Sequence, residues 1–98
     1  MTVIRRIVLD VLKPHNPPIV DLARKIAALK GVHGVNCTIE EVDQETESLC
    51  VVIEGESIDY DKVVEAIGQV GAVVHSVDSV SAGKRIVEET HTLEHGKI

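Results

Sequence analysis

Two aspartates are the residues of this chain best placed to bind a metal ion. Asp10 lies in a β-branched stretch near the N-terminus, and Asp78 lies in a valine-rich stretch much later in the chain. If these stretches pair as neighbouring strands, the carboxylates converge and offer the oxygen ligands that Ca²⁺ or Mg²⁺ prefers. The competing interpretation, which is the more common arrangement in proteins, is a network in which Arg6 neutralises both carboxylates at a contact between subunits.

His15 is the best single candidate for contacting a ligand or cofactor. It lies in the loop between the first predicted strand and the first predicted helix, where free backbone N–H groups attract anions. The alternative is a histidine that only fills the loop. The other four histidines are scattered and have no Cys or His partner at a zinc-binding spacing, although His91 and His95 would share a face if the C-terminal tail were helical.

Other motifs carry little chemistry. The acidic turn 43–47 lacks the glycine and the length of an EF-hand loop, and Gly83-Lys84 lacks the remaining residues of a phosphate-binding loop. No serine, cysteine or lysine has an evident base and orienting partner. We therefore expect a protein without catalytic activity; the alternative is an enzyme whose site forms between subunits, with His15 or Asp10 of one subunit facing another.

Composition limits the class of protein further. The 98 residues suit one domain, with 44% hydrophobic and 27% charged residues, and the aromatic content is a single tyrosine. The formal net charge is −6 and basic residues occur at most in pairs, so nucleic-acid binding is disfavoured. The chain shows two cysteines, no signal-peptide pattern and no apolar run of about 20 residues. We expect a soluble, cytoplasmic protein that does not bind membranes.

The hydrophobic pattern predicts six elements. Alternation of apolar residues predicts strands at 2–12, 35–43, 48–54 and 72–80, and a three- and four-residue spacing predicts helices from Ile19 to about Leu29 and from about Ile58 to Gln69. Asn16-Pro17 resembles the start of the first helix, and Ser57 or Asp59 can cap the second.

This βαββαβ order predicts an α+β, ferredoxin-like sandwich, with both helices on one face of an antiparallel sheet. Numbered along the chain, the strands are expected in the order 4-1-3-2. We take residues 1–88 as the domain and 89–98 as a polar C-terminal tail.

The sheet face away from the helices, here called the open face, should carry the alternate residues of each strand. Pairing Cys37 with Ile53 turns Cys37 inward and Cys50 outward, which excludes a disulfide between them. In the last strand we place His75 inward, because an unpaired buried Asp78 would cost more free energy than a neutral histidine.

The open face is then rich in valine and should be covered by a second copy of the chain, which predicts a homo-oligomer. Its predicted valines are Val8, Val42, Val52, Val74 and Val80.

Two stretches resemble a known family. Leu-Asp-Val-Leu-Lys-Pro-His at 9–15 and Ala-Gly-Lys-Arg-Ile-Val-Glu at 82–88 are similar to an archaeal family of uncharacterised small proteins, domain of unknown function 211, over residues 4–88. The resemblance implies a ferredoxin-like fold and homo-oligomeric rings, with no established activity and no catalytic residues. More distantly the fold resembles heavy-metal-associated domains, but the first loop lacks their Cys-x-x-Cys motif.

We therefore expect a regulatory or sensor module that binds a small ligand or a divalent cation. A purely structural or partner-binding ring is a further alternative.

Overall fold

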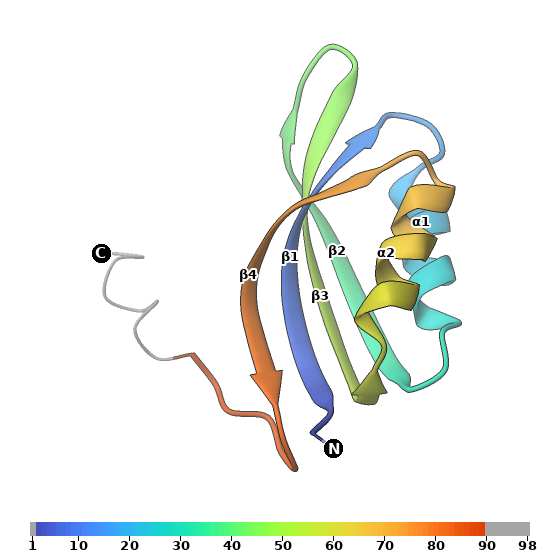
Figure 1. The fold of residues 1–98 in the computed structure, drawn as a ribbon. Helices are drawn as coiled ribbons and strands as arrows, with labels where there is room; N and C mark the ends of the chain where they lie inside the picture. The colour runs from blue at the N-terminus through green and yellow to red at the C-terminus, as the bar shows by residue number, and fades with distance from the viewer. Residues whose placement is uncertain (1, 90–98) are drawn as a thin grey trace.

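Four strands and two helices make up the part of the chain that the computed structural model describes, residues 2–89. They follow one another as β1 (Ile4–Pro14), α1 (Ile19–Ala27), β2 (Val32–Val42), β3 (Thr46–Ile58), α2 (Tyr60–Gln69) and β4 (Val73–Ala82). The strands form one antiparallel sheet in the order β2-β3-β1-β4, and both helices cover the same face (Figure 1). The predicted ferredoxin-like α+β fold is confirmed, because this order is 4-1-3-2 counted from the other edge.

The predicted tail, 89–98, lies outside the described residues except for Glu89. His91 and His95 lie outside them as well.

An aliphatic core fills the space between the sheet and the helices. Burial of the apolar side chains of the sheet against those of the two helices is the main source of folding free energy in such a domain. Tyr60, the single aromatic residue, packs at the margin of the core. The core comprises Ile7, Leu9, Val11, Leu22, Ile26, Leu49, Val51, Ile53, Ile58, Val63, Ala66, Ile67, Val70 and Ala72.

The helix starts are only partly as predicted. α2 is capped by Asp59, whose carboxylate accepts hydrogen bonds from the backbone N–H groups of Asp61 and Lys62 at 3.1 and 3.3 Å. The predicted start of α1 at Asn16-Pro17 is wrong: the N-cap is Pro18, without a side-chain cap hydrogen bond. The missing side-chain cap leaves the packing of Leu22 and Ile26 as the main support of α1.

The register of the central hairpin differs by two residues from the prediction. Cys37 pairs with Val51, not with Ile53, and Val35 takes the place opposite Ile53. A two-residue shift keeps every side chain on its face, because the side-chain period of a strand is two. Cys37 therefore packs against the core, and Cys50 lies on the open face, as predicted.

β4 is oriented as predicted only in its middle, where Ser76 pairs with Asp10 on the open face and Val77 pairs with the core residue Leu9. Elsewhere the prediction is wrong, and His75, which was predicted to point inward, is exposed.

Val74 pairs with Val11 and packs against the core, and Val80 pairs with the core residue Ile7. Over residues 6–12 of β1, the register with β4 shifts at two places, between residues 8 and 9 and between residues 10 and 11. Each shift adds a residue to β4 and breaks the alternation on which the prediction rested.

Val42 is also misplaced, because it pairs with Glu47 on the helix side of the sheet, after a register shift between Ile39 and Glu41. Of the five valines predicted for the open face, only Val8 and Val52 lie there. The open face is therefore less apolar than the sequence pattern indicates.

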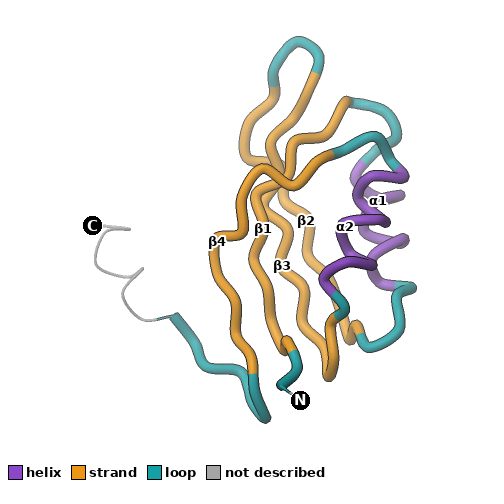
Figure 2. The backbone as a smooth tube through the Cα atoms, in the orientation of Figure 1, coloured by secondary structure: helices purple, strands orange, loops and turns teal. Residues whose placement is uncertain are grey.

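The loops gather at two ends of the sheet. Figure 2 shows the β1–α1 loop and the β2–β3 turn at one end, here called the first end. The α1–β2 loop and the β3–α2 connection lie at the opposite, second end.

Two glycines pack backbone against backbone at the second end, and we call them the glycine clamp. A Cβ on Gly31, whose φ is +88°, would lie 2.1 Å from the Ser57 carbonyl oxygen, and a Cβ on Gly55 would lie 2.0 Å from the Gly31 carbonyl oxygen. The Glu56 N–H donates to that Gly31 oxygen at 3.0 Å. Only glycine fits at these two positions.

Replacing Gly31 with alanine should therefore destabilise the fold. The methyl group overlaps backbone atoms and the left-handed φ is strained, so we expect a loss of about 2 kcal/mol or more in the free energy of unfolding by urea. Gly34→Ala is the matched control, since nothing lies within 4 Å of its Cβ position. Equal stabilities for the two variants would contradict the clamp.

Candidate functional site

Asp10 and Asp78, the predicted metal ligands, lie in one neighbourhood on the open face. Asp10 pairs with Cys50 of β3 on one side and with Ser76 of β4 on the other. The Ser76 hydroxyl donates to Asp78 Oδ1 at 2.7 Å. Burial raises the pKa of the Cys50 thiol, and the negative charges of Glu40, Asp78 and Asp10 raise it further. The positive charge of Arg6 lowers the pKa of the same thiol.

One chain does not complete a metal site in the region that the structure describes. Among residues 2–89, no three His, Cys, Asp or Glu side chains are grouped so that they could hold an ion. Asp10 and Asp78 as metal ligands stay a prediction, and further oxygens would have to come from water or from another copy of the chain.

Arg6 forms an ion-pair network with other carboxylates than those predicted. Its guanidinium contacts Glu54 at 3.2 Å and Glu89 at 2.9 Å. Val87 N–H donates to the Ser81 hydroxyl at 2.8 Å, so the segment after β4 is held against this side of the sheet. Within residues 2–89, Arg6 forms ion pairs with Glu54 and Glu89 and none with Asp10 or Asp78, which weakens the competing interpretation within one chain.

His15 links the β1–α1 loop to the β2–β3 turn at the first end. Its Nδ1 lies 3.3 Å from Glu47 Oε2, and its Nε2 lies 2.9 Å from the Asp43 carbonyl oxygen and 3.1 Å from that of Gln44. All three partners are acceptors, so both ring nitrogens donate when the imidazole is protonated. The hydrogen bond with Glu47 is the main reason that the pKa of His15 is raised. That His15 contacts a ligand stays a prediction.

Lys13, which the sequence analysis did not single out, is fully buried beside His15. Its Nζ lies 2.9 Å from Glu47 Oε1 and donates to the carbonyl oxygens of Pro14, His15 and Pro17. The hydrogen bond from Lys13 is the largest cause of a lowered pKa at Glu47. The signal was present in the sequence, since Lys13 continues the inward alternation of Ile7, Leu9 and Val11.

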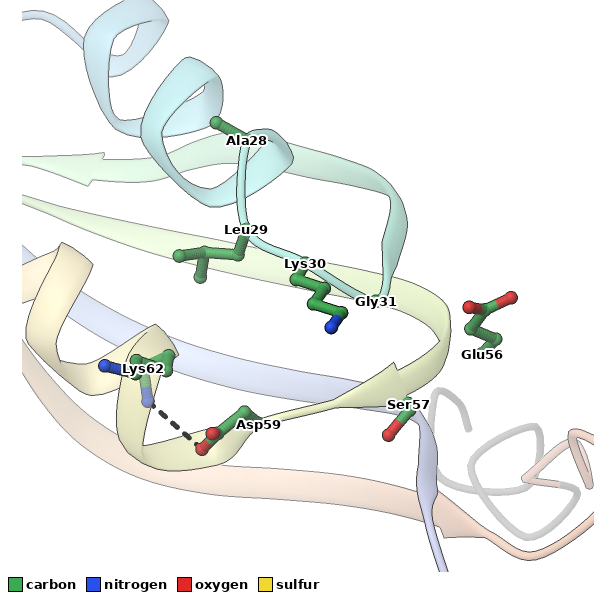
Figure 3. Close-up of a pocket in the computed structure, with 8 residues that line it drawn as sticks. All are labelled: Ala28, Leu29, Lys30, Gly31, Glu56, Ser57, Asp59 and Lys62. Atoms are coloured by element: carbon green, nitrogen blue, oxygen red, sulfur yellow. Dashed lines mark hydrogen bonds between the residues drawn. The ribbon is translucent and has the colours of Figure 1, made fainter.

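A hollow of about 480 Å³ lies at the second end, between the end of α1 and the start of α2 (Figure 3). In the close-up, the Lys30 side chain extends from the loop after α1 toward β3, and the Asp59 carboxylate turns toward the Lys62 N–H. The sequence gives no local signal for this hollow, because its walls come from three elements that only the fold brings together. It is lined by Ala28, Leu29, Lys30, Gly31, Glu56, Ser57, Asp59 and Lys62.

Neither helix within residues 2–89 has the length and hydropathy that crossing a membrane requires.

Comparison with known proteins gives two matches over nearly the whole chain. A profile of the DUF211 family, described as uncharacterised ArCR, matches residues 5–96. A protein of Methanocaldococcus jannaschii, described as uncharacterised protein MJ0319, is 51% identical over 92 residues, which cover 94% of this chain and 95% of that protein. These descriptions name no ligand, reaction or partner.

The His15 contacts predict a pH-dependent stability. Because the folded state raises the pKa of His15 above about 6.5, its contribution is complete below that pH and is lost as pH rises through the folded pKa. Melting temperatures of the wild type should therefore fall over this window relative to those of His15→Gln. His33→Gln is the control, because His33 faces only the exposed Glu56 at 3.5 Å. The same pH profile in wild type and His15→Gln would refute the assignment.

Proposed function

Since the chain belongs to the DUF211 family, an archaeal family described as uncharacterised, we propose that it is a non-catalytic binding module that assembles with copies of itself through the two edges of its sheet. Membership agrees with the resemblance predicted from residues 9–15 and 82–88. The observation that carries the proposal is the placement of the exposed aliphatic side chains, which gather at opposite edges of the sheet.

The first group, here called the β4 edge, consists of Val64 on α2 with Val73, Val77 and Val80 on β4. A hollow of about 720 Å³ runs between α2 and β4 and includes Val64, Val73 and Val77 in its lining. Exposed aliphatic groups in a concave surface are typical of a contact with another protein.

The second group, here called the β2 edge, consists of Ile39 and Val42 on β2 with Val20 on the adjoining helix α1. β2 and β4 are the two outermost strands, so each also presents backbone groups without a neighbouring strand in the described sheet. Exposed aliphatic side chains on one edge and an apolar hollow on the other suit a head-to-tail contact between identical chains. Such contacts close into rings when the rotation between copies allows it.

Divalent-cation binding is a second function that a separate observation favours. Asp10, Asp78 and Glu40 all raise the pKa of the Cys50 thiol and Arg6 alone lowers it, so carboxylates outnumber basic groups around that position of the open face. Each chain carries a formal net charge of −6, and assembly multiplies that charge. Ca²⁺ or Mg²⁺ bound by Asp10 and Asp78 would relieve the repulsion.

The alternative of an enzyme with a site between subunits has less support. Its candidates were His15 or Asp10 facing another subunit, and in the folded chain both ring nitrogens of His15 lie within hydrogen-bond distance of protein acceptors. A purely structural ring would share the edge contact but would bind neither cation nor small ligand. Native mass spectrometry separates these alternatives, because it reports subunit number and retained ligands together.

Val77→Glu should dissociate the assembly, because it places an unpaired charge in the contact at the β4 edge. Sedimentation velocity at micromolar concentration should give an oligomer for wild type and a species near 10.6 kDa for the variant. Val52→Glu on the open face is the matched comparison and should leave the oligomer intact. An oligomer that survives Val77→Glu and dissociates with Val52→Glu would place the contact on the open face, and a monomeric wild type would end the proposal.

Millimolar Ca²⁺ or Mg²⁺ should raise the melting temperature of chelator-treated protein by binding the folded state preferentially, whereas Zn²⁺ should have no specific effect. The double variant Asp10→Asn with Asp78→Asn should lose this response and keep its fold. Asp21→Asn with Asp61→Asn removes the same charge from the helices and should keep the response. The cation proposal is wrong if the wild type melts at one temperature with and without the ion.

A further inference from the structure

The charges around the hollow at the second end are unevenly paired. Asp59 is engaged by the backbone at the start of α2, and Glu56 faces His33 at 3.5 Å. Lys30 has no ion pair or hydrogen bond from its ammonium within residues 2–89. Lys62 has only a 3.8 Å contact with Glu65, in which both side chains are mostly exposed. Among the lining charges of the described chain, Lys30 is therefore the least engaged by the protein itself, while Lys62 and Glu56 each have one weak, exposed contact.

The floor of the hollow is apolar and its backbone is fixed. Ala28 and Leu29 at the end of α1 contribute aliphatic surface, and Ser57 contributes a hydroxyl. The glycine clamp holds Gly31 against the end of β3, because its carbonyl oxygen accepts from Glu56 N–H at 3.0 Å. A site whose backbone is already in place loses less conformational entropy when a ligand binds.

We propose that this hollow binds a small organic anion, a carboxylate or phosphate monoester with a short aliphatic chain. Lys30 and Lys62 meet the anionic group, and Leu29 and Ala28 contact the chain. The volume of about 480 Å³ lies within the usual range for small-molecule sites. All of these residues belong to one chain, and none belongs to the exposed aliphatic groups of the β4 edge or the β2 edge, so the site does not depend on self-assembly.

The acidic side chains at the rim restrict the ligand further. Glu56 and Asp59 stand beside the two lysines, so a compact ligand with one anionic group is favoured over a polyanion such as a nucleoside triphosphate. The net charge of −6 acts in the same direction, since long-range repulsion grows with the charge of the ligand.

Saturation-transfer NMR with butyrate and with butyl phosphate tests the proposal, and butylammonium serves as the probe of opposite charge. We expect a saturable signal for at least one of the anions and none for butylammonium. Which anion binds distinguishes a carboxylate ligand from a phosphate ligand. A signal of equal strength for butylammonium would show an apolar site without charge selection and would overturn the proposal, as would the absence of a saturable signal for both anions.

The double variant Lys30→Gln with Lys62→Gln should weaken binding by about tenfold, the loss expected for two solvent-accessible charge contacts. Lys25→Gln with Lys84→Gln removes the same charge away from the hollow and should bind as wild type does. Unchanged melting temperatures for both double variants confirm that the fold is kept. Equal weakening in both, or none in either, would show that the anion does not bind between Lys30 and Lys62.

Discussion

The buried ammonium of Lys13 is the constraint on which the first end of the molecule depends. A charge with no exposed surface is tolerated only when it is neutralised and hydrogen-bonded, and Lys13 has the Glu47 carboxylate and three backbone carbonyl oxygens around it. The carbonyls of His15 and Pro17 belong to the β1–α1 loop, and Glu47 belongs to β3. One side chain of β1 thereby fixes both the loop that leads into α1 and the start of β3. His15 adds a second link through the same Glu47.

The second end is stabilised by close backbone packing, whereas the first end is stabilised by a buried ion pair. The glycine clamp brings the backbone after α1 into contact with the end of β3, and Asp59 then starts α2 directly beyond that contact. Each helix is therefore fixed at one end by a specific polar or steric arrangement and along its length by the aliphatic core. The surfaces left for function are the two sheet edges, the open face and the hollow between the helix ends.

Most of the fold could be predicted because period-two and helical spacing record which face of each element is buried. Leu9 and Leu22 are examples, since their local pattern alone indicates their burial. Val74 and Val80 could not be placed in this way, because two register shifts between β1 and β4 change the alternation, and nothing local marks them. Lys13 continues the inward alternation of β1, but burial of a lysine becomes plausible only when its partner is known, and the fold alone brings Glu47 to it. The hollow at the second end could not be predicted either, because the fold brings its walls together from three elements. The neighbourhood of Asp10 and Asp78 could be predicted, because it follows from the order of the strands.

The apolar edges and the acidic open face have complementary consequences for assembly. A head-to-tail contact through the edges would repeat the sheet from copy to copy and set identical open faces beside one another, so the carboxylates near Cys50 would add to those of the next copy. The apolar contact would supply the attraction, and this repulsion would oppose it. A cation bound at the open face would then shift the balance toward the assembled state, and by linkage assembly would raise the affinity for the cation. If the chain assembles and binds cations as we propose, self-association and cation binding would be linked in one equilibrium, with the sheet edges setting the strength of association and Asp10 and Asp78 its response to ions.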